Sequence, residues 1–235
     1  MIKVIPAIIP HAYEQFAAEI KTVSKFAKMI QMDISDGAFV KTTTWPYNGR
    51  DNDFFQRLVN EEIGWPEYNH VEFEVHLMVE NPEESVIDWI RTGVTSVVAH
   101  IEATTDFQKV INICKEHNVA IGVAIKTSTN ISMIEPYIPQ VDFVQVMGSD
   151  LLGKHGVELD MSSVLPRVKA LRKLYPERII GIDIGVTRET AEPLVEAGAT
   201  RLVSGSTILG AANPELAFRE LESLGSEKET DIRSL

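Results

Sequence analysis

Eight short runs of apolar, largely β-branched residues recur along the chain, and a helical pattern follows each of them. The apolar runs span residues 3–9, 27–34, 70–78, 95–100, 119–125, 142–147, 178–184 and 200–205. The helical patterns span residues 13–27, 52–63, 82–93, 106–117, 131–138, 162–175, 188–198 and 214–224. Near-continuous apolar runs are typical of strands buried on both faces of a parallel sheet. Eight strand–helix alternations without a break in composition predict one closed α/β barrel, a (β/α)8 TIM barrel.

The competing fold is an open, doubly wound sheet, which usually has fewer units and a glycine-rich turn after its first strand. Here the first run leads into Ile9, Pro10 and His11, with no glycine. We therefore predict a single barrel domain over residues 1–224, followed by a frayed, charged tail over residues 225–235. The long polar and aromatic segment Lys41–Asp51 follows the second strand and is interpreted as a lid or an oligomer contact.

Charge and composition exclude several classes of partner. The chain has 22 Lys and Arg residues against 34 Asp and Glu residues, a net charge of −12, which argues against nucleic acid and anionic membranes as partners. The sequence has no run of about eighteen apolar residues, and its first residues do not follow the signal-peptide pattern. The single cysteine, Cys114, is expected to be a buried structural thiol, and the predicted location is the cytoplasm.

Polar side chains stand at or near the predicted ends of most of the apolar runs. In a parallel barrel the carboxyl ends of all the strands meet on one face, which is where active sites lie. In chain order these side chains are Gln31, Asp33, Asp36, His76, His100, Glu102, Lys126, Asp183, Ser204 and Ser206. We therefore expect them around the mouth of one cavity.

Asp33 and Asp183 are the residues expected to carry the chemistry. They lie on the second and seventh strands, which are well separated around the ring, so one carboxylate could remove a proton from carbon while the other returns one. With His76 they form a donor set that suits a divalent cation, which would stabilise an enediolate as a Lewis acid. Asp36 is either a site residue or only the first residue of an Asp-Gly turn. His100 is expected in the wall of the same cavity.

A phosphate site is predicted after the last strand. The backbone amides of Gly205 and Ser206 could hold a phosphate, and Gly185 would let the backbone approach it closely. Loops after the seventh and eighth strands are the recurrent phosphate site of these barrels. The loop after the sixth strand supplies Gly153 and Gly156, and it either closes over the same anion or is an ordinary connection.

The chain resembles ribulose-phosphate 3-epimerases over nearly its whole length. The matching segments are, in the family's order and spacing, MDISDGAFV, EVHLMVENPEE, AHIEA, VLPRVKALRKL and IDIGVTRETAEPLVEAGATRLVSGSTILG. The resemblance implies a barrel of the ribulose-phosphate-binding type that interconverts ribulose 5-phosphate and xylulose 5-phosphate by proton transfer at C3. It also implies a small phosphorylated sugar as the partner, and a homo-oligomer.

The resemblance also assigns roles to residues. In the family two aspartates act as acid and base, and they fall on Asp33 and Asp183. A divalent metal, often zinc, iron, manganese or cobalt, is held by these aspartates and two histidines, one of which falls on His76. Methionines of the family's site fall on Met78 and Met147, and the phosphate site falls on Gly185, Gly205 and Ser206. Together with His76, His100 and Gly156, these residues are the expected substrate and phosphate contacts.

The departures from the family's pattern surround the ligand. Gln31 replaces the family's first metal-binding histidine, and an amide oxygen is a much poorer zinc ligand than imidazole, so metal affinity is expected to fall or to change its preference. The other departures are Ala7 for a serine, Ser35 for a methionine, Ile184 for a glycine, Lys126 for a neutral residue, and SDLLGKHG for a glycine-rich loop. Because these changes lie around the ligand rather than in the scaffold, substrate or metal dependence is expected to differ from the family's.

The leading hypothesis is a sugar-phosphate epimerase, an isomerase. Without a cation, Lys126, Lys154 or His155 would stabilise the oxyanion instead. The alternatives are an epimerase of another ketose phosphate, an aldolase or lyase with Lys126 as a Schiff-base amine, and a non-catalytic protein that binds a sugar phosphate. The sequence leaves these alternatives open.

Overall fold

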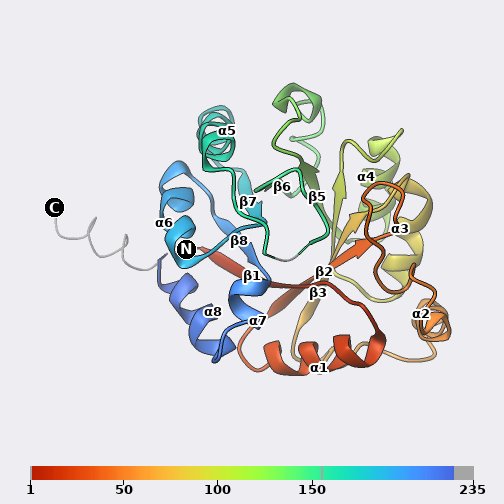
Figure 1. Cartoon of the computed structure of the whole chain (residues 1–235). Helices are drawn as coiled ribbons and strands as arrows, with labels where there is room; N and C mark the ends of the chain where they lie inside the picture. Colours follow the sequence, from red (N-terminus) through yellow and green to blue (C-terminus); the bar gives the residue numbers. More distant parts are fainter. Residues whose placement is uncertain (1, 155, 225–235) are drawn as a thin grey trace.

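Eight parallel strands close into a barrel in which each strand pairs with its neighbours in sequence and β1 pairs with β8 (Figure 1). The computed structural model describes residues 2–154 and 156–224. The strands are β1 (Lys3–Ile8), β2 (Met29–Ser35), β3 (Glu72–Met78), β4 (Ser96–His100), β5 (Ala120–Ile125), β6 (Phe143–Met147), β7 (Ile179–Asp183) and β8 (Arg201–Ser204). The prediction of a (β/α)8 TIM barrel is therefore confirmed.

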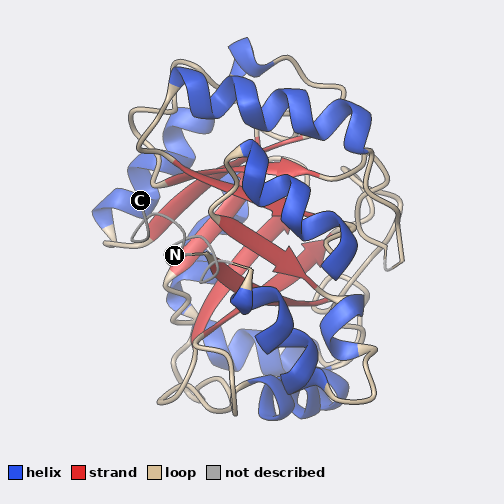
Figure 2. Cartoon of the chain, turned by 90° about the vertical axis from the view of Figure 1, so that its left-hand side faces the viewer, coloured by secondary structure: helices blue, strands red, loops and turns tan. Residues whose placement is uncertain are grey.

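Helices surround the strands, as the side view makes plain (Figure 2). They are α1 (Tyr13–Val23), α2 (Asn52–Val59), α3 (Pro82–Arg91), α4 (Phe107–Glu116), α5 (Met161–Leu174), α6 (Arg188–Ala197), α7 (Ser206–Leu209) and α8 (Pro214–Ser223), with a 3-10 turn, η1 (Ile131–Met133). The apolar face of each long helix packs on the outside of the barrel; in α4, for example, the buried side chains are Phe107, Val110, Ile111 and Cys114. This outer layer forms the large hydrophobic core.

The polar residues of the strands lie on the inner face of the barrel, and the hydrophobic core lies on its outer face. Successive side chains of a strand point to opposite sides of the sheet. On β2, Ile30, Met32 and Ile34 belong to the outer core. The alternate residues Gln31 and Asp33 make hydrogen bonds with side chains from β3, β6 and β7, across the interior of the barrel. The barrel interior therefore contains a polar layer.

One predicted helix is wrong. The pattern over residues 131–138 yields only η1 and a series of turns. Pro136 lies within this segment of eight residues, and a proline removes a backbone donor and disfavours helical geometry at the residue before it. Ile134 and Ile138 are nevertheless fully buried. The apolar spacing therefore predicted which side chains are buried, but not the backbone conformation around Pro136.

The segment Lys41–Asp51 is attached to the barrel. Trp45 is fully buried among the rings of Tyr13, Phe16, Phe55 and Trp65. Its backbone amide donates to the carbonyl of Pro10 over 2.9 Å. The lid and the oligomer contact both stay predictions for this segment, as do the domain limits. The predicted tail over residues 225–235 lies outside the described residues.

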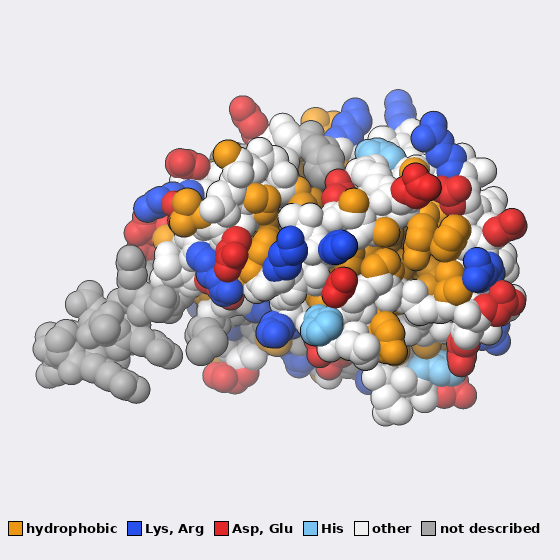
Figure 3. All heavy atoms as spheres, turned by 90° about the horizontal axis from the view of Figure 1, so that it is seen from below, with side chains coloured by type: hydrophobic (Ala, Val, Ile, Leu, Met, Phe, Trp, Pro, Cys, Tyr) orange, Lys and Arg blue, Asp and Glu red, His pale blue; other side chains and the backbone are white. Residues whose placement is uncertain are grey.

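Two other expectations concern the surface and the thiol. On the face shown in Figure 3, Lys and Arg side chains are interspersed with Asp and Glu, and its described residues form no continuous basic patch. In the part of the chain that the structure describes, no helix has the length and apolar character needed to cross a membrane. Cys114 is buried, as expected, and burial raises the pKa of its thiol to about 12.

Candidate active site

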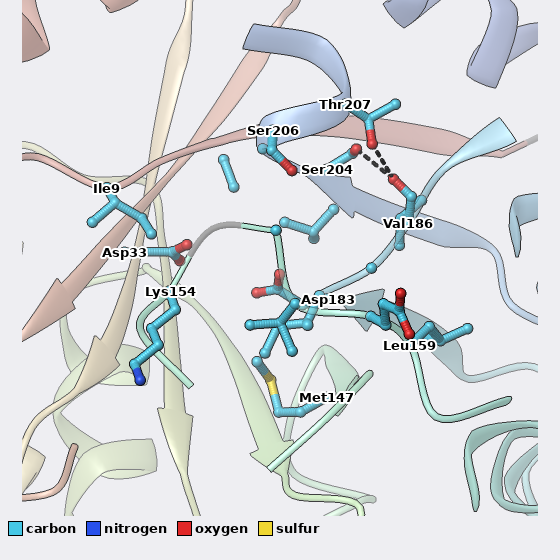
Figure 4. A pocket seen from close by; sticks show the side chains of 18 of the residues that line it. Ile9, Asp33, Met147, Lys154, Leu159, Asp183, Val186, Ser204, Ser206 and Thr207 are labelled. Carbon is cyan, nitrogen blue, oxygen red and sulfur yellow. Dashed lines mark hydrogen bonds between the residues drawn. The ribbon is translucent and has the colours of Figure 1, made fainter. Parts of the chain in front are cut away.

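A cavity of about 390 Å³ opens at the carboxyl ends of the strands (Figure 4). Of the residues expected from the sequence, those that line it are Asp33, His76, Met78, Met147, Gly153, Gly156, Asp183, Gly185, Ser204, Gly205 and Ser206, together with Lys154. His100 and Gln31 are fully buried and lie behind this surface, each in contact with His76. The structure therefore gathers the predicted residues into one place, although their roles stay predictions.

Asp33 and Asp183 approach the cavity from opposite sides, and Figure 4 shows both carboxylates directed toward the space between them. The side-chain amide of Gln31 joins them. Its Nε2 donates to Asp33 Oδ1 over 2.8 Å and to Asp183 Oδ2 over 2.7 Å. Two strands that are five apart in sequence order are thus connected by one amide group inside the barrel.

His76 lies against the same pair of carboxylates. Its Nδ1 is 3.1 Å from Asp33 Oδ1 and 3.4 Å from Asp183 Oδ2. Burial lowers the pKa of His76, but hydrogen bonds and negative charge from Asp183 and Asp33 outweigh burial and raise it to about 9. Burial and the charge of Asp183 raise the pKa of Asp33, and His76 and Gln31 partly oppose that rise. The site thus holds the pKa of His76 and that of Asp33 above their usual values.

A chain of hydrogen bonds fixes how the ring of His76 is held. His100 Nδ1 is 3.0 Å from Glu102 Oε2, and because a carboxylate only accepts, His100 donates there. Burial lowers the pKa of His100 to about 4, so its other nitrogen is a neutral acceptor near pH 7. His76 Nε2 lies 3.1 Å from that nitrogen and therefore donates to it. Nδ1 of His76 is left facing the two aspartates.

The loops after β7 and β8 form another part of the cavity wall. The hydroxyls of Ser204 and Thr207 both donate to the carbonyl of Val186, over 2.8 and 2.9 Å, which ties the two loops together (Figure 4). Gly185 has φ of +69°, and a Cβ there would lie 2.5 Å from the backbone nitrogen of Leu159. Glycine is therefore required where this loop passes the loop after β6. The result is a fixed wall of backbone at the predicted phosphate position.

The cationic residues that the sequence suggested as substitutes for a cation lie in different places. Lys154 lines the cavity, and its side chain extends away from Ser206 in Figure 4. Lys126 is not among the described lining residues; its Nζ lies 4.2 Å from the centre of the Phe39 ring. His155 lies outside the described residues. The structure thus gives Lys126 a contact with an aromatic ring rather than with the cavity.

Sequence reasoning missed Gln145, which is fully buried on β6. Its Nε2 donates to Asp183 Oδ2 over 2.9 Å and to Gln31 Oε1 over 3.2 Å. The available signal was its position, since Gln145 is two residues before Met147 and therefore faces the same side of the strand. Neither a strand-end position nor the resemblance to a family marked it, although His76 lies equally far from the end of β3.

The donor set suits a divalent cation. One ligand atom from each of Asp33, His76 and Asp183 lies within 4.8 Å of the others. Two carboxylates and an imidazole are ligands that such cations accept in proteins. Gln31 is the fourth polar group at this place, and it could take part only through its amide oxygen.

Comparison with known proteins places the chain in a family. The model of the Ribulose-phosphate 3 epimerase family matches residues 3–209. The chain belongs to the ribulose-phosphate 3-epimerase family. It is 30% identical over 227 residues to ribulose-phosphate 3-epimerase of Bacillus subtilis, covering 94% of this chain and 98% of the relative. It is 28% identical over 214 residues to the Candida glabrata enzyme of that name, covering 89% and 86%. The predicted membership, and the prediction of an isomerase, are confirmed.

Solved structures of low sequence identity share the fold. A 3-hexulose-6-phosphate synthase superposes with a TM-score of 0.68 at 16% identity, covering 94% of this chain and 99% of that one. The crystal structure of KGPDC from Streptococcus mutans superposes with a TM-score of 0.70 at 12% identity, covering 94% and 95%. At these identities the likeness establishes the barrel alone.

Proposed function

We propose that this member of the ribulose-phosphate 3-epimerase family epimerises a phosphorylated ketose, with ribulose 5-phosphate and xylulose 5-phosphate as the substrate pair. The observation that carries the proposal is the pairing of Asp33 and Asp183. Their carboxylates face each other across the cavity and are joined by one amide nitrogen. Epimerisation needs an acid and a base on opposite faces of a planar intermediate.

Proton transfer then follows from the two carboxyl groups. In one direction Asp183 takes the proton from the carbon beside the carbonyl, and an enediolate forms. Asp33, whose pKa is raised by burial and by the charge of Asp183, returns its own proton to the other face of that carbon. The reverse reaction exchanges the roles. The His76 ring, held as a donor by the neutral His100, keeps a positive charge beside both carboxylates.

The substrate would be oriented by its phosphate. The loops after β7 and β8 line the same cavity as the aspartates at Gly185, Gly205 and Ser206. Backbone amides hold a phosphate without a lysine or arginine. A phosphate held there would orient the sugar so that the carbon to be epimerised lies between the two carboxylates.

The residues present fit a divalent cation at this site. Asp33, His76 and Asp183 would hold it, and a bound cation would supply a Lewis acid for the negative charge of the enediolate. We expect binding weaker than at a site with a second histidine, because the fourth group here is the Gln31 amide.

Proton NMR in heavy water tests this function. Purified protein is incubated with ribulose 5-phosphate, with and without added Mn²⁺ or Zn²⁺. We expect the C3 proton signal to disappear while xylulose 5-phosphate accumulates. Asp183→Asn is the control, because it keeps the shape of the side chain and removes the base.

The outcomes separate the candidate functions. Exchange without added metal in chelator-treated protein would show that the carboxylates act without a cation. Absence of exchange in both conditions would overturn ribulose 5-phosphate as the substrate and direct the same assay to other ketose phosphates. Borohydride trapping of the protein on a keto substrate, lost in Lys126→Ala, would favour a lyase instead.

A further inference from the structure

Two buried amide side chains meet inside the barrel, Gln31 from β2 and Gln145 from β6. Both are fully buried, and Gln145 Nε2 lies 3.2 Å from Gln31 Oε1. The amide oxygen and nitrogen of a glutamine differ in chemistry, since the oxygen accepts hydrogen bonds or binds cations and the nitrogen only donates. Which atom of each amide faces the aspartates therefore decides what the site can bind.

The orientation of Gln145 follows from Asp183. The nitrogen of Gln145 donates to Asp183 Oδ2 over 2.9 Å, and the amide oxygen, which only accepts, could not make this hydrogen bond to a carboxylate oxygen. Gln145 Oε1 is left buried without a hydrogen-bond partner among the described residues, which carries a cost in free energy. Turning the amide over would satisfy that oxygen no better, because it would then face the carboxylate.

The orientation of Gln31 follows from Gln145. Because the nitrogen of Gln145 is toward Gln31, the near atom of Gln31 must be its oxygen. The Gln31 nitrogen is then directed at Asp33 and Asp183, and both of its protons are used there, over 2.8 and 2.7 Å. The two amides and the two carboxylates form one consistent network in which each amide orientation requires the other.

We propose that Gln145 is a positioning residue that holds the Gln31 amide with its nitrogen toward the two aspartates, and thereby opposes cation binding at this site. An amide binds a cation through oxygen, so Gln31 must turn over before it can serve as a ligand. Once turned, its nitrogen would face the nitrogen of Gln145, where two donors meet and neither has an acceptor. The network and the four-ligand cation site exclude one another.

This inference deepens the proposed function, on which it rests for the role of the aspartates, and it concerns how the same site distinguishes a cation from a hydrogen-bond donor. The hydrogen bonds from Gln31 hold the two carboxylates at a fixed separation when no cation is present. The test therefore measures the cation directly and uses no substrate.

The measurement is Co²⁺ binding to the full chain after chelator treatment, followed by the visible absorption of the bound ion and by calorimetry. Gln145→Leu removes the donor that holds Gln31 and leaves an apolar side chain of similar size. We expect Gln145→Leu to bind Co²⁺ about tenfold more tightly than the unaltered protein, the effect of roughly one buried hydrogen bond. Affinity equal to or weaker than that of the unaltered protein would overturn the proposal.

Two further variants isolate the path through Gln31. In the Gln31→Leu background, adding Gln145→Leu should no longer increase the Co²⁺ affinity, because the Gln31 oxygen that Gln145 keeps turned away is then absent. An increase that persists in the double variant would contradict the proposal. Gln140→Leu is the matched control, since Gln140 and Gln108 form a reciprocal amide pair, 3.0 Å in each direction, away from the strands of the site. Its Co²⁺ affinity should equal that of the unaltered protein.

If Gln145→Leu does not fold, Gln145→Met serves instead, because an unbranched apolar side chain fits irregular space. The NMR signals of the Gln31 side-chain amide give an independent readout. They should exchange slowly with water in the unaltered protein, and the Co²⁺ concentration at which they shift or broaden should be about tenfold lower in the Gln145 variants. Failure of epimerase activity leaves these results unaffected, so the two proposals fail separately.

Discussion

Glu102 holds the ring of His100, which in turn contacts His76. Its Oε1 accepts the backbone amide of Lys126 over 2.8 Å as well as the Thr129 hydroxyl, and its Oε2 accepts from His100. Burial alone would raise the pKa of Glu102, but these hydrogen bonds and the His100 ring lower it to about 2. A carboxyl group that is more acidic in the folded protein than in the unfolded chain stabilises the fold at neutral pH.

The stability of the protein should therefore depend on Glu102 in acid. The contribution is fully present above a pH of about 4.5, the usual pKa of this group, and is lost as the pH falls toward about 2. We expect Glu102→Gln to lower the unfolding free energy at pH 7 by about 2 kcal/mol. The fall in stability between these two pH values should also become shallower. Urea titrations across that range measure both effects, and Glu135→Gln, at an exposed position, should leave the profile unchanged.

The role of Asp183 in catalysis should be separable from its contribution to folding. In Asp183→Asn the amide oxygen can still accept from Gln31 and Gln145, so the network that holds the side chain is retained. We expect turnover of the ketose phosphate to fall by about 10²–10⁴-fold, the range lost with a general acid or base, while the substrate dissociation constant changes little. Thermal unfolding checks that the variant remains folded, and substrate titration checks that the dissociation constant is unchanged. Wild-type turnover in this variant would remove Asp183 from the mechanism.

Some of the residues in the barrel interior were predictable from the sequence, and others were not. Asp33, His76 and Asp183 lie within the last three residues of β2, β3 and β7, where a parallel barrel collects its chemistry, and the resemblance to a family marked the same positions. Gln145 lies as near the end of β6 but is marked by no resemblance, and Glu74 lies further inside β3; both have apolar neighbours on each side. Only the alternation of faces along a strand could have shown that they point into the barrel.

Between β7 and α6 the backbone is strained at one residue. Ile184 follows Asp183 directly and has φ of +80°, a region that a β-branched residue rarely occupies. Its side chain packs, partly buried, against the cluster that includes Met78 and Met147. The turn that aims Asp183 into the cavity thus combines a backbone cost with a packing contribution from the same residue.

A pair of substitutions separates the two contributions. Ile184→Ala and Ile184→Gly both remove the packing, but only glycine relieves the positive φ. We expect Ile184→Gly to be more stable than Ile184→Ala by about 1 kcal/mol in chemical denaturation. At Ile182, which is fully buried within β7, the order should reverse, because glycine is unfavourable in a strand. If the alanine variant were more stable than the glycine variant at position 184 as well, Ile184 would carry no backbone strain.

Element assignment succeeded where periodicity and local chemistry agreed. The eight strands were predictable because each is a short run of β-branched residues bounded by helical patterns. The helix over residues 131–138 was not, because its apolar spacing describes two buried isoleucines that a series of turns presents equally well. The short helix α7, of four residues, lies below the length at which a periodic pattern can be recognised.

On the scale of the whole barrel, the interior below the active site contains a buried ion pair. Glu74 of β3 and Arg201 of β8 are joined directly, and Ser96 donates to the other oxygen of Glu74 over 2.7 Å. The guanidinium of Arg201 also lies 4.1 Å from the centre of the Phe143 ring. Groups from β3, β4, β6 and β8 therefore meet in the amino-terminal half of the barrel, below the two aspartates.

This pair should matter for stability and not for catalysis, and a set of three variants tests that. Arg201→Leu and Glu74→Leu each leave an uncompensated buried charge, so we expect each to lose about 3–5 kcal/mol of unfolding free energy. The double variant removes both charges, and its stability should recover most of that loss, since apolar residues can replace a buried ion pair at little cost. Chemical denaturation measures the cycle, and turnover by the folded fraction should stay near that of the unaltered protein. A double variant as unstable as the sum of the two single changes would mean that packing around Phe143, rather than charge, holds this part of the barrel together.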